Sequence, residues 1–242
     1  MLFAWTNHET PDELFEAEET FPGLGFVLKG SNYHAVEDLS VPPIAYITAL
    51  TQAKTVRSWI ETGAKFTAVL VNDERNQTGP SGAYMEPADY AQHFQPVYDI
   101  LHDLVPVHTM GLAPRRTWWW DMWRSRRFDD DYHAQLPDAD GRAWNPNGVR
   151  RREVERSLRL PGPWILSPAP FRGWWDRFWT PVNEREWGRI SQRENVTGVA
   201  LWCLREVWAG AGYGDRWQSE HGLFDRHGNV TRVGRAVLAA LE

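Results

Sequence analysis

The stretch VLVNDERN, from Val69 to Asn76, changes abruptly from an apolar segment to a cluster of polar and charged side chains. Its first three residues have the character of a short buried strand. The remaining five are Asn, Asp, Glu, Arg and Asn. Such an end is compatible with a surface turn or with the rim of a functional site, so the fold around the stretch decides its meaning.

Apolar or β-branched runs like this one recur along the chain and alternate with segments of helical period. The strand-like segments are 2–6, 24–30, 44–50, 66–71, 105–111, 131–135, 164–168 and 196–204. The clearest helical segments are 11–21, 51–63, 87–104, 147–160, 183–195 and 229–242. In the first two of these, the pattern marks Pro11 as a helix start, Thr51 as an N-cap and Gly63 as a C-terminal glycine.

Alternation of strands and helices is typical of a mostly parallel sheet covered by helices. Eight strands with a helix after the last one favour a closed barrel, and an open doubly wound sheet is the alternative. The sequence therefore predicts an α/β protein, a single compact (β/α)8 (TIM) barrel that spans residues 1–242 as one domain. No glycine-rich phosphate loop follows the first strand, which disfavours a dinucleotide-binding fold.

Composition and motifs exclude several classes of function. The net charge of −6 and a pI of about 5.8 give no general support for binding nucleic acid. The only cysteine, Cys203, lies in an apolar run and is expected to be a buried core residue. The eight histidines show no zinc-binding spacing, and no GxSxG nucleophile motif occurs. We expect no metal and no cofactor.

The start of the chain has no basic segment, no long apolar run and no cleavage site, so neither a signal peptide nor membrane insertion is expected. We therefore expect a cytoplasmic protein, or a virion component that is released by lysis. The 15 tryptophans are an unusual excess. They include the run RTWWWDMW, Arg116–Trp123, which is compatible with core packing and with a surface for a partner protein or a sugar.

Polar and aromatic side chains follow the expected strands at the edge where a barrel carries its functional groups. Carboxylates, imidazoles, amides and aromatic rings together suit a polyhydroxylated ligand, because they offer hydrogen bonds and flat apolar floors. The residues concerned are Asn7, His8, Glu9, Asn32, Tyr33, His34, Thr48, Asp73, Glu74, Asn76, Met110, His133, Gln135, Ser167, Arg205 and Glu206.

Three stretches of the chain resemble a known family. NDERN (72–76) is similar to the Asn-Glu-Pro end of strand four in (β/α)8-barrel glycoside hydrolases, with Arg75 in the place of the proline. GVALWCLREVW (198–208) and HGLFDRHGNVTRVGRAVLAAL (221–241) resemble the eighth strand, the Gly-Leu-Phe-Asp segment and the last helix of that family. The resemblance covers the chain from about Phe66 onward.

The resemblance implies an acid/base role for Glu74, beside Asp73 and Asn76, and a sugar platform at Trp202. Among the other polar rim residues, Asn32 and His133 are candidates for hydrogen bonds to sugar hydroxyls. Each of these roles has a plainer structural alternative. In that alternative, Glu74 forms an ion pair with a neighbouring arginine, Trp202 is a barrel-core residue, and His133 makes its hydrogen bonds to other residues of the rim.

The seventh strand departs from the family. Its nucleophilic glutamate is replaced by Ser167 or Pro168, and no carboxylate follows before Asp176. A retaining glycosidase needs two carboxyl groups about 5–5.5 Å apart, and an inverting one needs them about 6.5–9.5 Å apart. Glu206, Glu9 and Asp131 are the candidates for a second carboxylate.

The resemblance and this departure together lead to two expectations. The first is a glycosidase-like barrel that binds a cell-wall or surface polysaccharide with degenerate or absent hydrolysis, a pseudoenzyme in a phage tail, virion or cell-surface assembly with protein partners. The alternative is an active glycoside hydrolase that uses Glu74 as its general acid with a non-standard second carboxylate. Sequence leaves open whether the protein is an enzyme, which sugar it takes and its oligomeric state.

Overall fold

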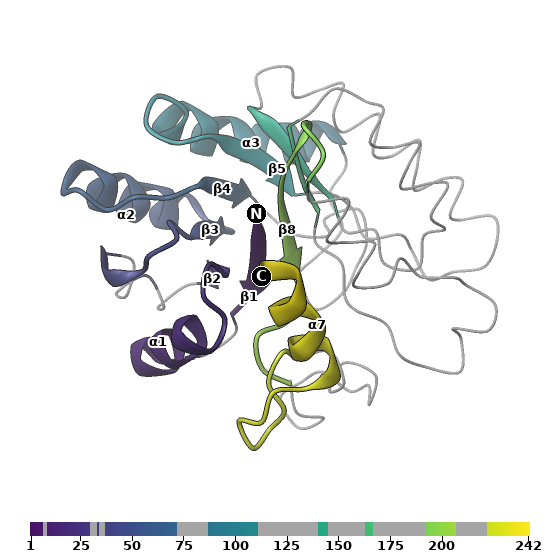
Figure 1. Cartoon of the computed structure of the whole chain (residues 1–242). Helices are drawn as coiled ribbons and strands as arrows, with labels where there is room; N and C mark the ends of the chain where they lie inside the picture. The colour runs from purple at the N-terminus through teal and green to yellow at the C-terminus, as the bar shows by residue number, and fades with distance from the viewer. Residues whose placement is uncertain are drawn as a thin grey trace.

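A computed structural model describes residues 1–6, 9–29, 33, 37–71, 87–110, 140–144, 163–166, 192–206 and 222–242. Eight parallel strands are hydrogen-bonded in sequence order, and the first pairs with the last, so that the sheet closes into a barrel (Figure 1). The strands are β1 (Leu2–Trp5), β2 (Gly25–Lys29), β3 (Ile44–Ile47), β4 (Ala68–Val71), β5 (Val107–Met110), β6 (Gly141–Trp144), β7 (Trp164–Leu166) and β8 (Val196–Leu201).

The predicted α/β class is confirmed. Every observed strand except β6 lies within the segment that was predicted for it. The sixth strand was expected at 131–135, but the barrel uses Gly141–Trp144 there, paired with β5 and β7. Residues 131–135 lie outside the described part of the chain. The strand GRAW was missed because it begins with glycine and holds only two apolar residues, a weak strand pattern.

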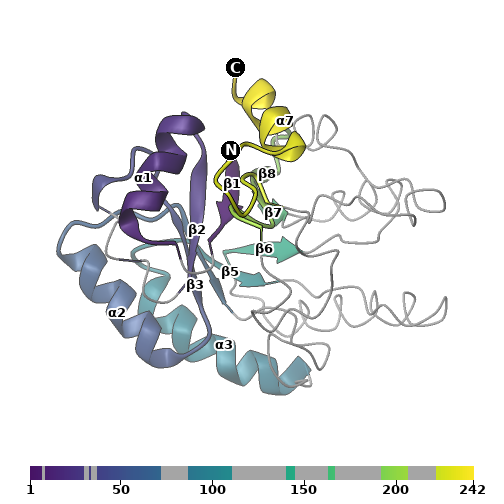
Figure 2. The same cartoon turned by 90° about the horizontal axis from the view of Figure 1, so that it is seen from below.

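Four helices belong to the described residues: α1 (Pro11–Thr20), α2 (Leu50–Glu61), α3 (Pro87–Leu101) and α7 (Arg232–Leu241). They lie on the outside of the strands in both views of the fold (Figures 1 and 2). They follow β1, β3, β4 and β8, as the alternation predicts. The complete eightfold alternation and the single domain over 1–242 stay predictions. None of these described helices is long and apolar enough to cross a membrane.

The helix ends follow local chemistry. Thr10 caps α1 in a reciprocal capping box with Glu13, and Pro11 occupies the first turn as predicted. The predicted N-cap of α2 at Thr51 is wrong, because the helix begins at Leu50 and its N-cap is Ala49. There, the side chain of Gln52 accepts the backbone N–H of Ala49. Gly63 follows the end of α2 with a φ of 113°, which confirms its predicted place.

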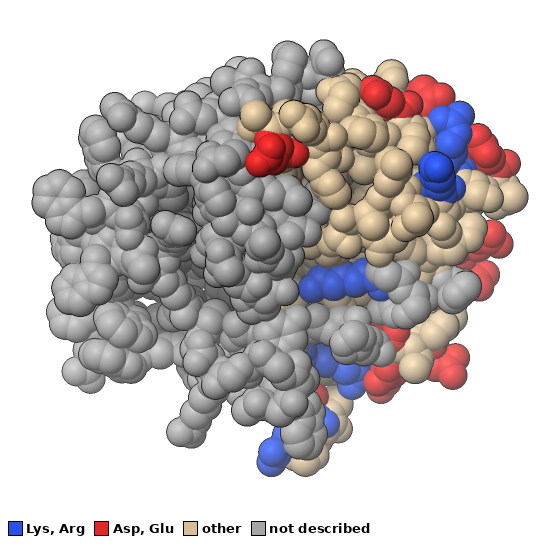
Figure 3. Space-filling model, turned by 180° about the vertical axis from the view of Figure 1, so that it is seen from behind, with Lys and Arg blue, Asp and Glu red and all other residues tan. Residues whose placement is uncertain are grey.

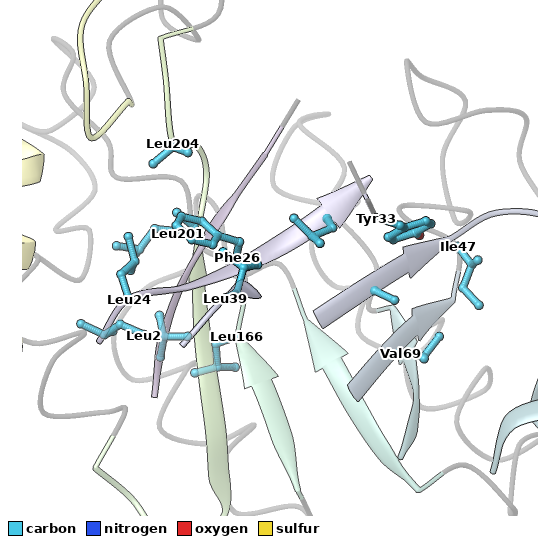
Figure 4. Close-up of a cluster of buried hydrophobic side chains, with 14 of the residues drawn as sticks. Leu2, Leu24, Phe26, Tyr33, Leu39, Ile47, Val69, Leu166, Leu201 and Leu204 are labelled. Atoms are coloured by element: carbon cyan, nitrogen blue, oxygen red, sulfur yellow. The ribbon is translucent and has the colours of Figure 1, made fainter. Parts of the chain in front are cut away.

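Two apolar clusters occupy the two sides of the sheet. The outer cluster packs the strands against the helices, and Figure 4 shows part of it, with Leu2, Phe26, Val69 and Leu201 among its members. The inner cluster fills the barrel and comes from alternate residues of the same strands: Phe3, Trp5, Val27, Ile44, Ala68, Leu70, Ile165 and Ala200, with Cys203. Alternation along each strand therefore divides the sequence between the two clusters.

Helix α3 contributes to the outer cluster with Tyr90, Phe94, Val97 and Leu101, all buried as its periodicity predicts. Leu104, expected on the same face, is 38% exposed. The helix ends at Leu101, so the helical spacing that predicted burial of Leu104 no longer applies.

A histidine and a glycine pack tightly inside the barrel. His108 of β5 is only 2% exposed, and its partner in register is Gly141 of β6. A Cβ atom added to Gly141 would lie 2.7 Å from Nδ1 of the His108 ring. Glycine at this point of β6 is therefore required by the imidazole beside it.

We expect Gly141→Ala to lower the free energy of unfolding by about 1–3 kcal/mol, the usual cost of overpacking. Urea denaturation of the wild type and the variant measures this difference. The matched control is the same change in a His108→Ala background, where the ring is gone and the added methyl should cost much less. An equal cost in both backgrounds would contradict the proposed clash.

Candidate functional site

Three aromatic rings and one lysine lie together at the carboxyl ends of four neighbouring strands. Trp5 and Lys29 are the last residues of β1 and β2, Tyr46 lies near the end of β3, and Trp202 follows β8 directly. We call these four residues the aromatic–lysine cluster. Because the strands are parallel, their carboxyl ends meet at the same mouth of the barrel, where functional groups collect in this architecture.

The register of the strands brings the four residues together. Ala4 pairs with Leu201, so Trp5 and Trp202 each stand one residue beyond that pair. Lys29 is paired directly with Tyr46. The side chains of Tyr46 and Trp202 pack against the inner cluster, to which Trp5 belongs. The cluster is therefore the top of the barrel interior and not part of the outer layer.

Trp5 meets the ring of Tyr46 edge to face and that of Trp202 at a tilt. The centroids of Trp5 and Tyr46 are 5.2 Å apart at an interplanar angle of 71°, and those of Trp5 and Trp202 are 6.1 Å apart at 53°. Both distances lie in the favourable range for aromatic pairs. Trp5 is only 1% exposed, whereas Tyr46 and Trp202 are partly exposed. Trp5 thus supports two rings that can still meet a ligand.

The ammonium group of Lys29 lies over the rings. Its Nζ is 4.3 Å from the centroid of Trp202, 5.0 Å from that of Trp5 and 5.8 Å from that of Tyr46. All three distances are within the range of cation–π attraction. The electron-rich ring faces stabilise the ammonium at a point where much of its hydration is replaced by protein.

The residues that follow Trp202 are fixed by hydrogen bonds. Cys203 is fully buried in the inner cluster, as predicted, and its thiol donates to the carbonyl oxygen of Arg205 at 2.8 Å. The next backbone N–H, that of Leu204, donates to the carbonyl oxygen of Trp5 at 2.8 Å. The peptide bond between Trp202 and Cys203 is cis.

Arg205, expected at the rim, is engaged with the first helix. Its guanidinium lies 3.0 Å from the carboxylate of Glu16 and 3.5 Å from that of Glu13, both on α1. It also lies over the ring of Phe224, 5.1 Å from the centroid. These contacts join the segment after β8 to α1, so we assign Arg205 a structural role.

Two further residues expected at the rim also serve the fold. Tyr33 is buried, donates its hydroxyl to the carbonyl oxygen of Tyr46 at 2.6 Å and packs edge-on against Trp59 of α2. Burial raises the pKa of the Tyr33 phenol, so it stays protonated. Thr48 gives its backbone N–H and its hydroxyl to the side chain of Gln52 at the start of α2.

Two carboxylate candidates lie within the described part of the chain. Glu9 follows β1, and its side chain is almost completely buried at 6% exposure. Glu206 is partly buried, and its backbone N–H donates to the carbonyl oxygen of Phe224 at 3.0 Å. Within the described ranges, no group of three or more His, Cys, Asp or Glu side chains could hold a metal ion.

The other candidates lie outside the described residues: Asn32, Asp73, Glu74, Asn76, Asp131, His133, Ser167 and Pro168. The strand bounds still constrain their places in the chain. Strand β4 ends at Val71 and β7 at Leu166, so Glu74 and Ser167 follow the fourth and seventh strands as predicted. His133 and Asp131 were expected at the sixth strand, and this is wrong because they precede β6.

Sequence reasoning identified Trp202 but missed Trp5, Lys29 and Tyr46. Their signal was the period of two within the strands, because Phe3 and Trp5 or Ile44 and Tyr46 are alternate residues that share a face. Closure of the barrel then decides that this face is the interior. The last inward residue of each strand is the one that reaches the mouth.

The fold is shared with carbohydrate-active proteins of known structure. A GH128 (subgroup II) endo-beta-1,3-glucanase from Sorangium cellulosum matches with a TM-score of 0.67 at 13% identity, over 99% of this chain and 98% of that one. A GH128 (subgroup VII) oligosaccharide-binding protein from Cryptococcus neoformans matches with a TM-score of 0.57 at 9% identity, over 99% and 93%. These likenesses establish the fold.

A beta-glucuronidase from Bifidobacterium dentium also matches, with a TM-score of 0.64 at 10% identity, over 99% of this chain but only 46% of that one. No protein-family model and no curated protein matches the sequence. The structural neighbours are glycoside hydrolase barrels and an oligosaccharide-binding relative, in agreement with the fold that the sequence resemblance predicted.

We expect Arg205→Met to lower the free energy of unfolding by about 1–2 kcal/mol, the sum of two partly exposed ion pairs and one cation–π contact. Part of this loss should vanish in high salt, which already screens the ion pairs. Urea denaturation at low and high salt measures both effects. Lys54→Met, on the exposed face of α2, removes the same charge and serves as the control. A loss no larger than that of the control would contradict the structural role of Arg205.

Proposed function

We propose that the protein binds a glycan at the carboxyl-terminal mouth of the barrel, with Trp202 as the stacking platform. The observation that carries the proposal is the partly exposed side chain of Trp202, which packs against the buried ring of Trp5. The flat apolar face of a sugar packs on an indole ring, and surrounding polar groups bond its hydroxyls. A ring fixed in advance loses little conformational entropy when the ligand arrives.

The structural neighbours support this class of ligand. One is an endo-beta-1,3-glucanase and another is an oligosaccharide-binding protein, so the same barrel serves both hydrolysis and binding. Because fold alone does not fix function, the argument for this chain rests on its own mouth residues. Oligosaccharides of β-1,3-linked glucose are the first ligands to test.

We further propose that hydrolysis is degenerate or absent. Strand β7 ends at Leu166, and the sequence continues with Ser167 and Pro168 where a retaining enzyme carries its nucleophile. Without a second carboxylate near the first, no covalent glycosyl intermediate can form. The competing proposal is an active hydrolase in which Glu74 is the general acid and Glu206 or Glu9 is the base.

We expect Trp202→Ala to weaken binding of β-1,3-gluco-oligosaccharides at least about ten-fold, which corresponds to about 1.4 kcal/mol. Trp202→Phe keeps a smaller ring and should lose less. Isothermal titration calorimetry measures both variants, and thermal unfolding confirms that they fold. Unchanged affinity in folded Trp202→Ala would show that the platform lies elsewhere.

For hydrolysis, we expect the purified wild type to release no reducing ends from β-1,3-glucan, and Glu74→Gln to leave this result unchanged. Measurable release would favour the active hydrolase. In that case loss of the release in Glu74→Gln would assign the acid, since the amide keeps the shape of the side chain but cannot donate a proton in the same way.

A place in a virion, phage tail or other cell-surface assembly is a further part of this proposal. It is motivated by the tryptophan-rich run 116–123, which suits a partner protein. Detection of the protein in purified particles tests it, and absence from such particles with accumulation in the cytoplasm would count against it.

A further inference from the structure

We infer that Lys29 covers the sugar-stacking face of Trp202 in the free protein, so that a glycan has to displace its ammonium group before it can stack. The inference rests on the proposed glycan site and adds to it a competitor within the chain. It makes Lys29 an autoinhibitory residue. Removal of Lys29 should strengthen binding, whereas removal of Trp202 should weaken it.

The strand pattern directs Lys29 into the mouth of the barrel. On β2, Val27 belongs to the inner cluster, and Gly25 lies against the ring of Phe3, another member of that cluster. Lys29 is the next alternate residue, so its side chain leaves the strand on the same inward side. The residue is partly buried there. Its ammonium therefore lies among inward side chains and not in the outer layer.

The ammonium stands on the side of Trp202 that faces the mouth. Its Nζ is 4.3 Å from the centroid of Trp202, 5.0 Å from that of Trp5 and 5.8 Å from that of Tyr46. Because these rings come from the ends of β8, β1 and β3, Nζ lies between them and not behind one of them. A ligand that enters the mouth meets the same side of Trp202.

Lys29 and a stacked sugar exclude each other. Carbon atoms in contact are about 3.5–4.0 Å apart, so a sugar on the indole fills the layer directly above its face. With Nζ 4.3 Å from the centroid of Trp202, the ammonium already occupies that layer. The cation–π attraction that holds the ammonium is therefore lost when a sugar takes its place, and this loss weakens binding.

The cover has a physical reason in the free protein. Trp5 ends β1 at the mouth, yet it is only 1% exposed. Lys29 contributes to this shielding, because its Nζ lies over the Trp5 ring and long charged side chains cover apolar surface with their stems. Lys29 also has a contact beyond those with the three rings, which adds to its hold. Its removal should therefore cost stability while it opens the site.

The ligand that displaces Lys29 is expected to be a neutral glycan. The chain carries a net charge of −6, and on the face seen in Figure 3 Asp and Glu lie mainly along the outer edge of the described part. Such a surface does not attract an anionic polysaccharide. The competition between ligand and ammonium therefore rests on stacking, which a neutral sugar provides through its apolar face.

Isothermal titration calorimetry with a neutral β-1,3-gluco-oligosaccharide tests the cover. We expect Lys29→Ala to bind this ligand at least about three-fold more tightly than the wild type, because the sugar no longer has to break a cation–π contact. Lys29→Met should gain less, since a side chain of similar length still covers the ring. The control is Lys54→Met on the exposed face of α2, which should leave the affinity unchanged.

The gain in affinity should depend on the platform. In a Trp202→Ala background, Lys29→Ala should change the affinity little, because no indole is left to uncover. Urea denaturation of Lys29→Ala without ligand should give a lower midpoint than that of the wild type, and a cooperative transition shows that the variant is folded.

A measurement on the wild type covers the case in which Lys29→Ala does not fold. With ¹³C-labelled lysine, each of the three lysines gives one NMR signal from its Cε–H groups, assigned with Lys54→Arg and Lys65→Arg. The surrounding rings should shift the Lys29 signal upfield in the free protein, while the exposed Lys54 and Lys65 keep ordinary positions. Saturation with the oligosaccharide should remove the upfield shift.

The outcomes separate this inference from the proposed function. Equal or weaker binding by folded Lys29→Ala overturns the inference and leaves glycan binding intact. A gain that persists without Trp202 also overturns it, as does a Lys29 signal that is not upfield in the free protein or stays upfield in the saturated one. Binding by Lys29→Ala with none by the wild type supports a complete cover. Absence of binding by both overturns the proposed function as well.

Discussion

The pairing of β1 with β8 is the contact on which the rest of this molecule depends. It joins strands from the two ends of the chain, with Leu2 opposite Val199 and Ala4 opposite Leu201. The backbone N–H of Leu204 extends the contact to the carbonyl oxygen of Trp5. Without this closure, Trp5 and Trp202 would lie at opposite edges of an open sheet. The barrel and its mouth are therefore made by the same set of hydrogen bonds.

Closure also sets a limit on side-chain volume inside the barrel. Large inward residues must face small ones, and the glycines mark the places where the limit is reached: Gly25 and Gly198 lie against the ring of Phe3, as Gly141 lies against His108. The rings of Phe3 and His108 thus fit inside the barrel because the neighbouring strands carry glycines beside them. At the mouth this constraint ends, and Trp5, Tyr46 and Trp202 can stand side by side.

Much of the fold could be predicted from the sequence because burial on both sides of the sheet gives apolar runs that stand out, such as Ala68–Val71 and Val196–Leu201. The sixth strand could not be predicted in this way. Its first residue, Gly141, is a glycine because the ring of His108 lies against it, and His108 is about thirty positions earlier in the chain. The site was harder still. Trp202 was found through a resemblance, whereas Lys29 looked like an ordinary strand end until closure placed three rings around it.

Two other residues that were expected at the rim of the barrel make structural contacts instead. Arg205 and Tyr33 are polar and follow strands, but each finds a partner in the outer layer: Arg205 with two acids of α1, and Tyr33 with the ring of Trp59 on α2. Position after a strand does not say whether a side chain turns toward the mouth or toward a helix. The partners decide it, and they come from distant parts of the sequence.

The strands that carry the platform differ from those that would carry the chemistry. Trp5, Lys29, Tyr46 and Trp202 come from β1, β2, β3 and the end of β8, whereas a retaining glycosidase places its two carboxylates after the fourth and seventh strands. The proposed stacking and the proton transfer of a glycosidase would therefore depend on different strands. In the sequence, Ser167 and Pro168 follow β7, whereas every residue of the aromatic–lysine cluster belongs to or follows another strand. The position of the rings depends on closure of the sheet between β1 and β8 and not on any carboxylate after the fourth or seventh strand.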